Sequence, residues 1–310
     1  MKVIKLKDIN LIYSNIPETE YNEWSSTTTY SIGDRVIVSY ESDGTTERTP
    51  HEIYESLTVS NTGNYPPDNL DKWLLVSATN RWKMFDNYVN TQTENADTIE
   101  VVVDFSQCDS FALLNVDCLS VDWYLYNGNW TDSETLVDNG RISLSHPIYN
   151  WYDYFYGWIK LRTNMYKDNM VMYNTSQLRL VLNKPGGTAK CGIMRFGKSS
   201  QIGLTQYGVS ISIIDYSKKI TDEFGNTYLK QGNYAKKVDC DAWISNDNID
   251  YVYKSLAELR SVPAIYNINN SSLQKYDFNS LIVYGFFNNF YINIPGPSYS
   301  QCTLEIEGLI

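Results

Sequence analysis

Apolar and polar residues alternate along several stretches of this 310-residue chain, and this two-residue period is typical of half-buried β-strands. In the clearest stretch, Ile99, Val101 and Val103 lie on one face, while Glu100 and Asp104 lie on the other. Turn residues separate the stretches, as in a β-sandwich. Similar alternation predicts further strands over residues 178–182, 209–213, 238–242, 281–287 and 302–308.

Two segments predict where strands reverse direction. Residues 183–187, Asn-Lys-Pro-Gly-Gly, predict a hairpin turn that leads towards Cys191. Residues 222–226, Asp-Glu-Phe-Gly-Asn, predict a second hairpin turn.

One stretch has the period of a helix instead. Its apolar residues recur at three- and four-residue spacing, at Ile249, Val252, Tyr253, Leu256 and Leu259. This spacing predicts a helix over residues 247–260, which Pro263 would end. The residues available to cap its start are Ser245, Asn246 and Asp247.

Composition agrees with a mainly β protein. Aromatic residues make up 14% of the chain, with 26 tyrosines, and they suit the pleated surface of a sheet. The fold class that we predict combines β-sandwich regions, a small inserted three-stranded module and a C-terminal β-rich domain with one helix. The predicted divisions are a strand or assembly arm at 1–20, the small module at 21–78, a β-sandwich domain at 79–200 and the C-terminal domain at 201–310.

Aromatic, glycine and proline residues follow a set order in the small module: Trp24, Tyr30, Gly33-Asp34, Val36, Tyr54, Asn64-Tyr65-Pro66-Pro67 and Trp73. This order resembles the short chitin- and cellulose-binding modules, although the polar insertion from Glu41 to Pro50 departs from their pattern. The resemblance implies aromatic side chains that stack on sugar rings. The candidates for glycan binding are Trp24, Tyr30, Tyr54 and Trp73, with Tyr40 and Tyr65 as further ones.

The same aromatic side chains have two other uses. A module of this size buries little surface, so at least two of Trp24, Tyr54 and Trp73 are expected to fill its core. The module could also serve as a decoration or a subunit contact in a larger assembly, because aromatic faces suit both uses.

Charge and cysteine content restrict the partners. The net charge of −11 argues against binding to nucleic acid, which requires excess lysine and arginine. No apolar run is long enough to span a membrane. The five scattered cysteines predict buried, reduced thiols and a protein made in a cytoplasm.

Groups for catalysis or metal binding are sparse. The two histidines, His51 and His146, have no neighbours at metal-ligand spacing and are interpreted as loop residues next to prolines. Glu305 and Glu307 share one face of a strand, which is typical of a polar side on a half-buried strand rather than of a catalytic pair. We therefore expect no enzyme activity, no metal and no cofactor.

Several segments together resemble a family of tailed-bacteriophage virion proteins from the neck and tail. The segments are the opening strand, the inserted Trp24 to Trp73 region, Asn80 to Asp86, Gly203 to Ser217, Tyr284-Gly285-Phe286 and Cys302 to Leu309. The resemblance covers nearly the whole chain and extends to short-tailed and crAss-like phages. It implies a structural subunit of a tail, collar or tail hub, located in the virion, whose partners are copies of itself in a ring and other neck or tail proteins.

Two alternatives remain open. A receptor-binding adhesin would hold a polysaccharide of the host surface through residues 21–78. A capsule-degrading enzyme would need a carboxylate pair in a cleft, for which Glu305 and Glu307 are the candidates.

Overall fold

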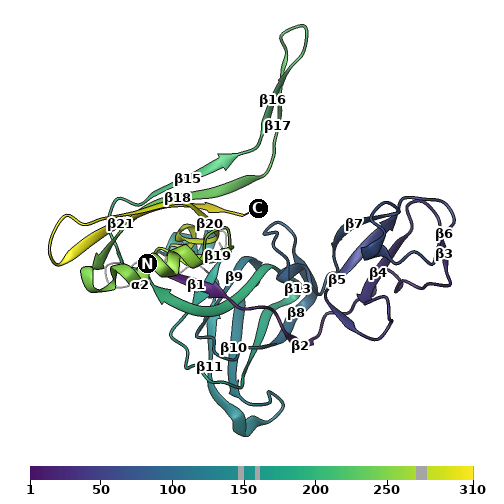
Figure 1. Ribbon diagram of the computed structural model, residues 1–310, viewed down its shortest axis with the longest axis horizontal. Helices are drawn as coiled ribbons and strands as arrows, with labels where there is room; N and C mark the ends of the chain where they lie inside the picture. Colours follow the sequence, from purple (N-terminus) through teal and green to yellow (C-terminus); the bar gives the residue numbers. More distant parts are fainter. Residues whose placement is uncertain (146–149, 158–160, 270–277, 310) are drawn as a thin grey trace.

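The structure is a computed structural model that describes residues 1–145, 150–157, 161–269 and 278–309. It confirms the mainly β fold class (Figure 1). Among the described residues, fourteen strands form one antiparallel sheet, and the others form separate sheets of two or three strands.

The small unit at 21–78 contains the predicted three-stranded sheet. Its strands pair in the order β4 (Arg35–Tyr40), β5 (Glu47–Ser56) and β7 (Trp73–Ala78). The polar insertion lengthens the β4–β5 hairpin, whose turn is fixed by hydrogen bonds from the backbone amides of Thr45 and Thr46 to the Asp43 carboxylate. The remaining elements of the unit are β3 (Thr29–Tyr30), β6 (Asn61–Thr62) and the short 3-10 helix η1 (Pro66–Asp68).

Among the described residues, the middle region has eight strands, and all of them except β1 contribute side chains to one core. The long strand β13 connects them, since its first half pairs with β10 and β8 and its second half pairs with β9 and β1. The strands are β1 (Lys2–Leu6), β2 (Leu11–Ser14), β8 (Thr93–Asp104), β9 (Ser110–Asp117), β10 (Ser120–Asn127), β11 (Leu136–Ser143), β12 (Met165–Lys167) and β13 (Ser176–Gln201).

The hairpin turn predicted at residues 183–187 is wrong. Strand β13 continues through these residues, and its pairing with β8 jumps from Asn183 to Thr188, which leaves them as an outward bulge. Gly186 adopts a φ of 73°, and its amide donates to the Asp97 carboxylate at 2.7 Å. The glycines therefore lie in a bulge within one strand, because the residues on both sides of them pair with the same strand, β8.

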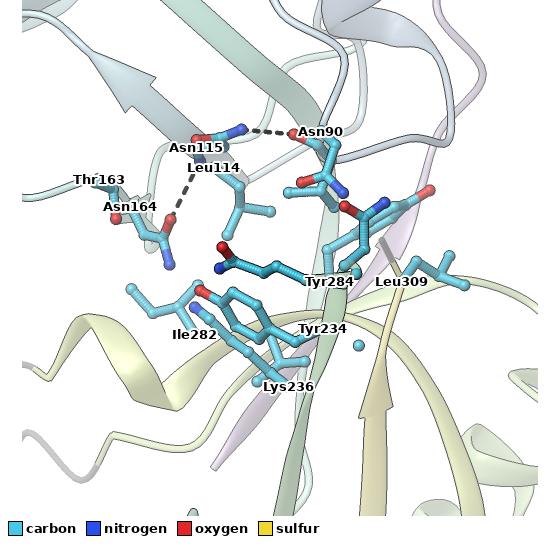
Figure 2. A pocket seen from close by; sticks show the side chains of 16 residues that line it. Asn90, Leu114, Asn115, Thr163, Asn164, Tyr234, Lys236, Ile282, Tyr284 and Leu309 are labelled. Atoms are coloured by element: carbon cyan, nitrogen blue, oxygen red, sulfur yellow. Dashed lines mark hydrogen bonds between the residues drawn. The ribbon is translucent and has the colours of Figure 1, made fainter. Parts of the chain in front are cut away.

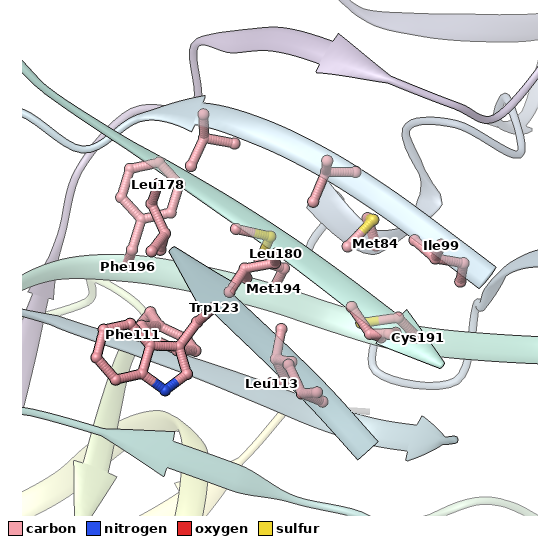
Figure 3. Packing of buried hydrophobic residues seen from close by; sticks show 14 of the residues in the cluster. Met84, Ile99, Phe111, Leu113, Trp123, Leu178, Leu180, Cys191, Met194 and Phe196 are labelled. Carbon is pink, nitrogen blue, oxygen red and sulfur yellow. The ribbon is translucent and has the colours of Figure 1, made fainter. Parts of the chain in front are cut away.

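The core of the middle region lies between strands that are far apart in sequence. Side chains from β8, β9, β10 and β13 meet there, as predicted from the alternation at Ile99, Val101 and Val103 (Figure 3). Phe111, Leu113, Leu180 and Phe196 fill the same space and are fully buried. Met84 of the 3-10 helix η2 (Lys83–Phe85) closes one end, so the segment after the small unit is part of this core.

The opening segment is the strand β1 rather than a free arm, which decides between the two alternatives for residues 1–20. It pairs with β13 on one side and with β19 (Ala264–Asn267) on the other. Val3 faces one core and Ile4 faces another, and both are fully buried. Lys2 forms an ion pair with Asp168 at 2.7 Å. Strand β1 therefore joins the middle region to the C-terminal region.

The C-terminal region is a sheet covered by the predicted helix. Helix α2 (Ile249–Glu258) buries Val252 and Leu256 against it. The strands are β14 (Leu204–Thr205), β18 (Tyr234–Ser245), β19 (Ala264–Asn267), β20 (Ile282–Asn293) and β21 (Tyr299–Gly308), and the 3-10 helix η5 (Asn279–Leu281) precedes β20. The long strands over 281–287 and 302–308 are thus confirmed.

The start of helix α2 differs from the prediction. A 3-10 turn, η4 (Asn246–Asn248), precedes it, and the capping position falls on Asn248, whose side chain makes no cap hydrogen bond. Asn246 is not free to cap, because its amide donates to the Gly296 carbonyl and its side-chain oxygen accepts from Ser300.

A hairpin projects from the body of the molecule between β15 (Ser210–Asp215) and β18 (Figure 1). It consists of β16 (Lys218–Thr221) and β17 (Thr227–Lys230), which pair with each other as a separate two-stranded sheet. The turn predicted at residues 222–226 forms its end. We call β16, β17 and this turn the projecting hairpin, and residues 222–226 its tip.

Two short elements complete the described chain. The 3-10 helix η3 spans Ser133–Thr135, and helix α1 spans Trp151–Tyr156 with its aromatic side chains exposed.

Candidate functional site

Three of the four predicted glycan-binding residues lie in the core of the small unit. Tyr30, Tyr54 and Trp73 are only 8%, 3% and 1% exposed. The rings of Tyr30 and Trp73 meet edge to face at 5.2 Å, and the Trp73 indole donates to the Asn64 carbonyl at 2.9 Å. These rings cannot stack on a sugar in this structure, which corrects their interpretation as ligand residues. The physical reason is that so small a unit needs its largest side chains as core.

Trp24 is the one candidate of the four that keeps part of its surface accessible. It packs against the core of the small unit, with its ring 5.4 Å from that of Tyr65 in an edge arrangement. Of the two further candidates, Tyr40 on β4 is exposed and Tyr65 is buried. Glycan binding by this unit stays a prediction from the sequence.

The two ends of the small unit meet at a cluster around Glu18. The Glu18 carboxylate lies 2.9 Å from Nδ1 of His51 and accepts from the Thr79 hydroxyl at 2.5 Å and from Arg81 at 2.8 Å. The amide of Asn80 donates to Glu20 at 2.5 Å. The entering and leaving segments are therefore adjacent, as expected for a unit inserted into a surface loop.

His51 belongs to this cluster and is not a loop residue. It lies on β5, is buried, and places its ring 5.3 Å from that of Trp82. The sequence suggested a loop because Pro50 precedes it, but the carboxylate that accounts for its burial comes from 33 residues earlier. His146, the other histidine, lies outside the described residues.

The Glu18 cluster gives a pH-dependent prediction. Burial alone would raise the pKa of the Glu18 carboxyl, but hydrogen bonds from His51 and Thr79 and the charge of Arg81 outweigh it and lower the pKa below 4.5. Because the folded-state pKa is the lower one, ionised Glu18 stabilises the fold above about pH 4.5, and this contribution is lost as the pH falls through the folded-state value. We expect Glu18→Gln to lower the free energy of unfolding by about 2 kcal/mol at neutral pH.

Urea unfolding at neutral and acidic pH measures this effect. The difference between Glu18→Gln and the unchanged protein should shrink once the pH is well below 4.5. Asp71→Asn, which changes an exposed carboxylate in the same unit, is the matched control and should alter stability little. A difference that persists unchanged in acid would contradict an ionic role for Glu18.

A cavity of about 600 Å³ opens at the root of the projecting hairpin (Figure 2). Its walls come from separate parts of the fold: Leu114 and Asn115 on β9, Tyr234 and Lys236 on β18, and Ile282 at the start of β20. Polar groups of the wall are partly engaged already, since the Asn115 amide donates to the Val89 carbonyl at 2.7 Å.

Lys236 is the one charged side chain among the described residues that line this cavity. It has no hydrogen bond or ion pair within the described chain, and burial lowers its pKa. The next residue, Lys237, lies on the opposite face and pairs with Glu305. Figure 2 shows Tyr234 and Lys236 side by side, directed into the cavity. This arrangement suits a ligand that carries an anionic group next to an apolar surface.

The sequence contained a signal for Lys236 that our interpretation did not use. Lys236 continues the two-residue period of Val238, Cys240 and Ala242, which are buried. A lysine two positions before such an alternating series of buried residues is expected to point to the same inner face of the strand. The cavity next to Lys236 could not be predicted, because the strands β9 and β20 that line it are distant from β18 in sequence.

The projecting hairpin is the second candidate surface. Phe224 at the tip is 89% exposed and Leu229 on β17 is 82% exposed. Further large apolar side chains are exposed on the hairpin and on β15, at Ile211, Ile213, Ile220 and Tyr228. Surfaces of this kind mark contacts with other molecules.

Groups for chemistry are engaged in structural contacts. Glu305 pairs with Lys237, and Glu307 accepts from Asn288 at 2.9 Å, so both carboxylates that the enzyme alternative would use already have partners. No cluster of three or more histidine, cysteine or acidic side chains that could hold a metal occurs within residues 1–145, 150–157, 161–269 and 278–309. None of the helices in the described ranges combines the length and apolar character needed to cross a membrane.

Comparison with known proteins leaves the family open. No protein-family model matches the chain, and no curated protein matches it at a significant level. The resemblance to phage neck and tail proteins therefore stays a prediction from sequence.

Proposed function

We propose that this chain is a structural subunit of a bacteriophage tail or neck, and that it assembles with copies of itself into a ring. The observation that carries the proposal is the projecting hairpin. A lone two-stranded hairpin is marginally stable in water, and this one exposes Phe224 and Leu229 almost completely. Such an element is stabilised when another molecule covers it.

Two further features support a ring. In a closed ring each subunit offers two different surfaces to its neighbours. The hairpin provides one surface that extends away from the body, and the cavity at its root provides a hollow one. The resemblance of the sequence to phage neck and tail proteins implies the same kind of assembly.

Size-exclusion chromatography with light scattering tests self-assembly. Over a range of concentrations, we expect a species whose mass is an integral multiple of the 35.7 kDa chain. A variant in which an Asn-Gly turn replaces residues 218–230 should stay folded, because these residues form a separate sheet, and should be monomeric. The matched control removes exposed apolar side chains elsewhere, with Val59→Ser and Leu70→Ser, and should assemble normally.

Mass spectrometry of purified virions tests the location. We expect the chain in particles of the phage that carries its gene, at a copy number that matches the ring measured in solution. A chain that stays monomeric at every concentration and is missing from virions would overturn the proposed function.

A further inference from the structure

The tip of the projecting hairpin is a hydrogen-bonded turn that carries an acidic and an aromatic residue next to each other in sequence. The Asp222 carboxylate holds the turn, since it accepts from the amides of Phe224 at 2.9 Å and Asn226 at 2.7 Å. Gly225 supplies the positive φ of 85° that this turn requires. The Asp222 carboxylate thus makes its hydrogen bonds within the turn, whereas the carboxylate of the neighbouring Glu223 does not.

Glu223 and Phe224 are presented to solvent by this turn. Glu223 is exposed and makes no hydrogen bond or ion pair with any described residue. Phe224 is almost fully exposed. An unpaired carboxylate and a phenyl ring thus lie at neighbouring positions of a turn whose shape is defined by the Asp222 hydrogen bonds.

The cavity offers the complementary chemistry. Lys236 provides an ammonium group without an acidic partner, and Leu114, Ile282 and Leu309 provide apolar wall. Its volume of about 600 Å³ is large enough for an aromatic side chain and a carboxylate together. The positive charge of Lys236 favours a carboxylate at this place, although the chain as a whole is negative.

The tip cannot reach the cavity of its own chain. The hairpin leaves the body from the rim of that cavity, where Gln231, Gly232 and Asn233 lie, and extends away from it (Figure 1). The five residues from Lys218 to Asp222 alone span roughly 17 Å at the rise of an extended strand. Another copy of the chain is therefore the molecule that carries a matching tip.

We propose that the hairpin tip of one copy enters the cavity of the next copy, where Glu223 pairs with Lys236 and Phe224 packs on the apolar wall. The inference rests on the proposed ring and names the contact that closes it. Because tip and cavity are different surfaces, the contact is head to tail, and repeating it gives a closed ring when the rotation between neighbouring copies closes after one full turn.

Charge reversal tests the contact. Glu223→Lys and Lys236→Glu should each weaken self-association by about tenfold or more, because each places like charges together at the contact. The double variant should regain association. An equimolar mixture of the two single variants should also regain it, since each tip then meets a cavity of opposite charge in the other chain. Restoration by mixing excludes misfolding as the cause of the single defects.

Glu134→Lys is the matched control, because Glu134 is an exposed carboxylate outside the tip and the cavity. It should associate like the unchanged protein. Light scattering and sedimentation velocity give the association constants, and circular dichroism verifies the fold of each variant.

The outcomes separate the two proposals. If the unchanged protein forms rings but the single variants associate normally, or if neither the double variant nor the mixture restores association, the contact is wrong and the ring stands. If the unchanged protein is monomeric at every concentration, the contact falls together with the ring, and mass spectrometry of virions decides whether the chain is a virion subunit. If Glu223→Lys forms normal rings but is excluded from virions, the tip binds another virion protein and the contact between copies is wrong.

Discussion

Removal of residues 302–310 is expected to prevent folding of the C-terminal region. These residues form most of β21, which lies between β20 and β18 in the sheet. Cys302, Leu304 and Ile306 are fully buried, and each such side chain contributes about 1.5–3 kcal/mol. Both neighbouring strands would also lose backbone hydrogen bonds, so the total loss is comparable to the whole stability of a typical domain, about 5–15 kcal/mol.

Circular dichroism and size-exclusion chromatography measure the result, with aggregation or loss of near-ultraviolet signal expected. The matched control replaces Tyr21 to Ser77 with a short Gly/Ser linker. It removes many more residues, but its ends already lie together, since Asn80 donates to Glu20 at 2.5 Å. The control should fold and assemble. A truncated chain that folds beside a control that does not would reverse the roles assigned to the two regions.

Truncation of Ile4 on β1 is expected to have the second largest effect. Ile4 is completely buried with Ala112, Ile193 and Ile265, from strands on both sides of β1. We expect Ile4→Ala to lower the free energy of unfolding by about 3–4 kcal/mol and Ile4→Val by about 1 kcal/mol. The larger change leaves a cavity where the two regions join, so they should begin to unfold in separate steps.

Urea unfolding followed by two probes checks this expectation. Tryptophan fluorescence and far-ultraviolet circular dichroism should coincide in the unchanged protein and diverge in Ile4→Ala. Lys5→Ala is the control on the same strand. It removes an exposed ion pair with Glu258 and should cost less than about 1 kcal/mol. Equal losses for Ile4→Ala and Lys5→Ala would contradict the central position of β1.

The sequence predicted strands and the helix well where the spacing of apolar residues followed one clear period. The alternation through Ile99, Val101 and Val103 gave a strand with one buried face, and the spacing of Val252 and Leu256 gave the helix. The acidic turn at residues 222–226 also formed as predicted, because its hydrogen bonds join residues at most four positions apart.

The errors share a cause, which is pairing between residues far apart in sequence. The opening segment alternates lysine with apolar residues, which left a free arm as one alternative, yet Lys2 of β1 and the following Lys7 form ion pairs with Asp168 and Asp104 across the fold. The glycines near Gly186 favour a turn locally, but β8 pairs with the strand on both sides of them. The pattern of residues along the sequence does not show which distant strand or side chain will pair with a segment. It therefore could not decide between an arm and a paired strand, or between a turn and a bulge.

The same limit applies to the candidate site. The order of Trp24, Tyr30, Tyr54 and Trp73 indicated a small module correctly, but order alone does not tell which rings face inward. The period of β18 contained an unused signal for Lys236 on the inner face, while its cavity depends on the meeting of β9, β18 and β20. The functional surface was thus less predictable than the strands that build it.

The burial of every cysteine is expected to protect the native protein from thiol reagents. All five are buried and free, and burial raises the pKa of Cys108 to about 11 and those of Cys118, Cys240 and Cys302 to about 12. Because alkylation requires an accessible thiolate, the native thiols should react only after local opening. A single cysteine introduced at an exposed position would then carry a fluorescent or cross-linking label by itself, with no need to remove the native thiols.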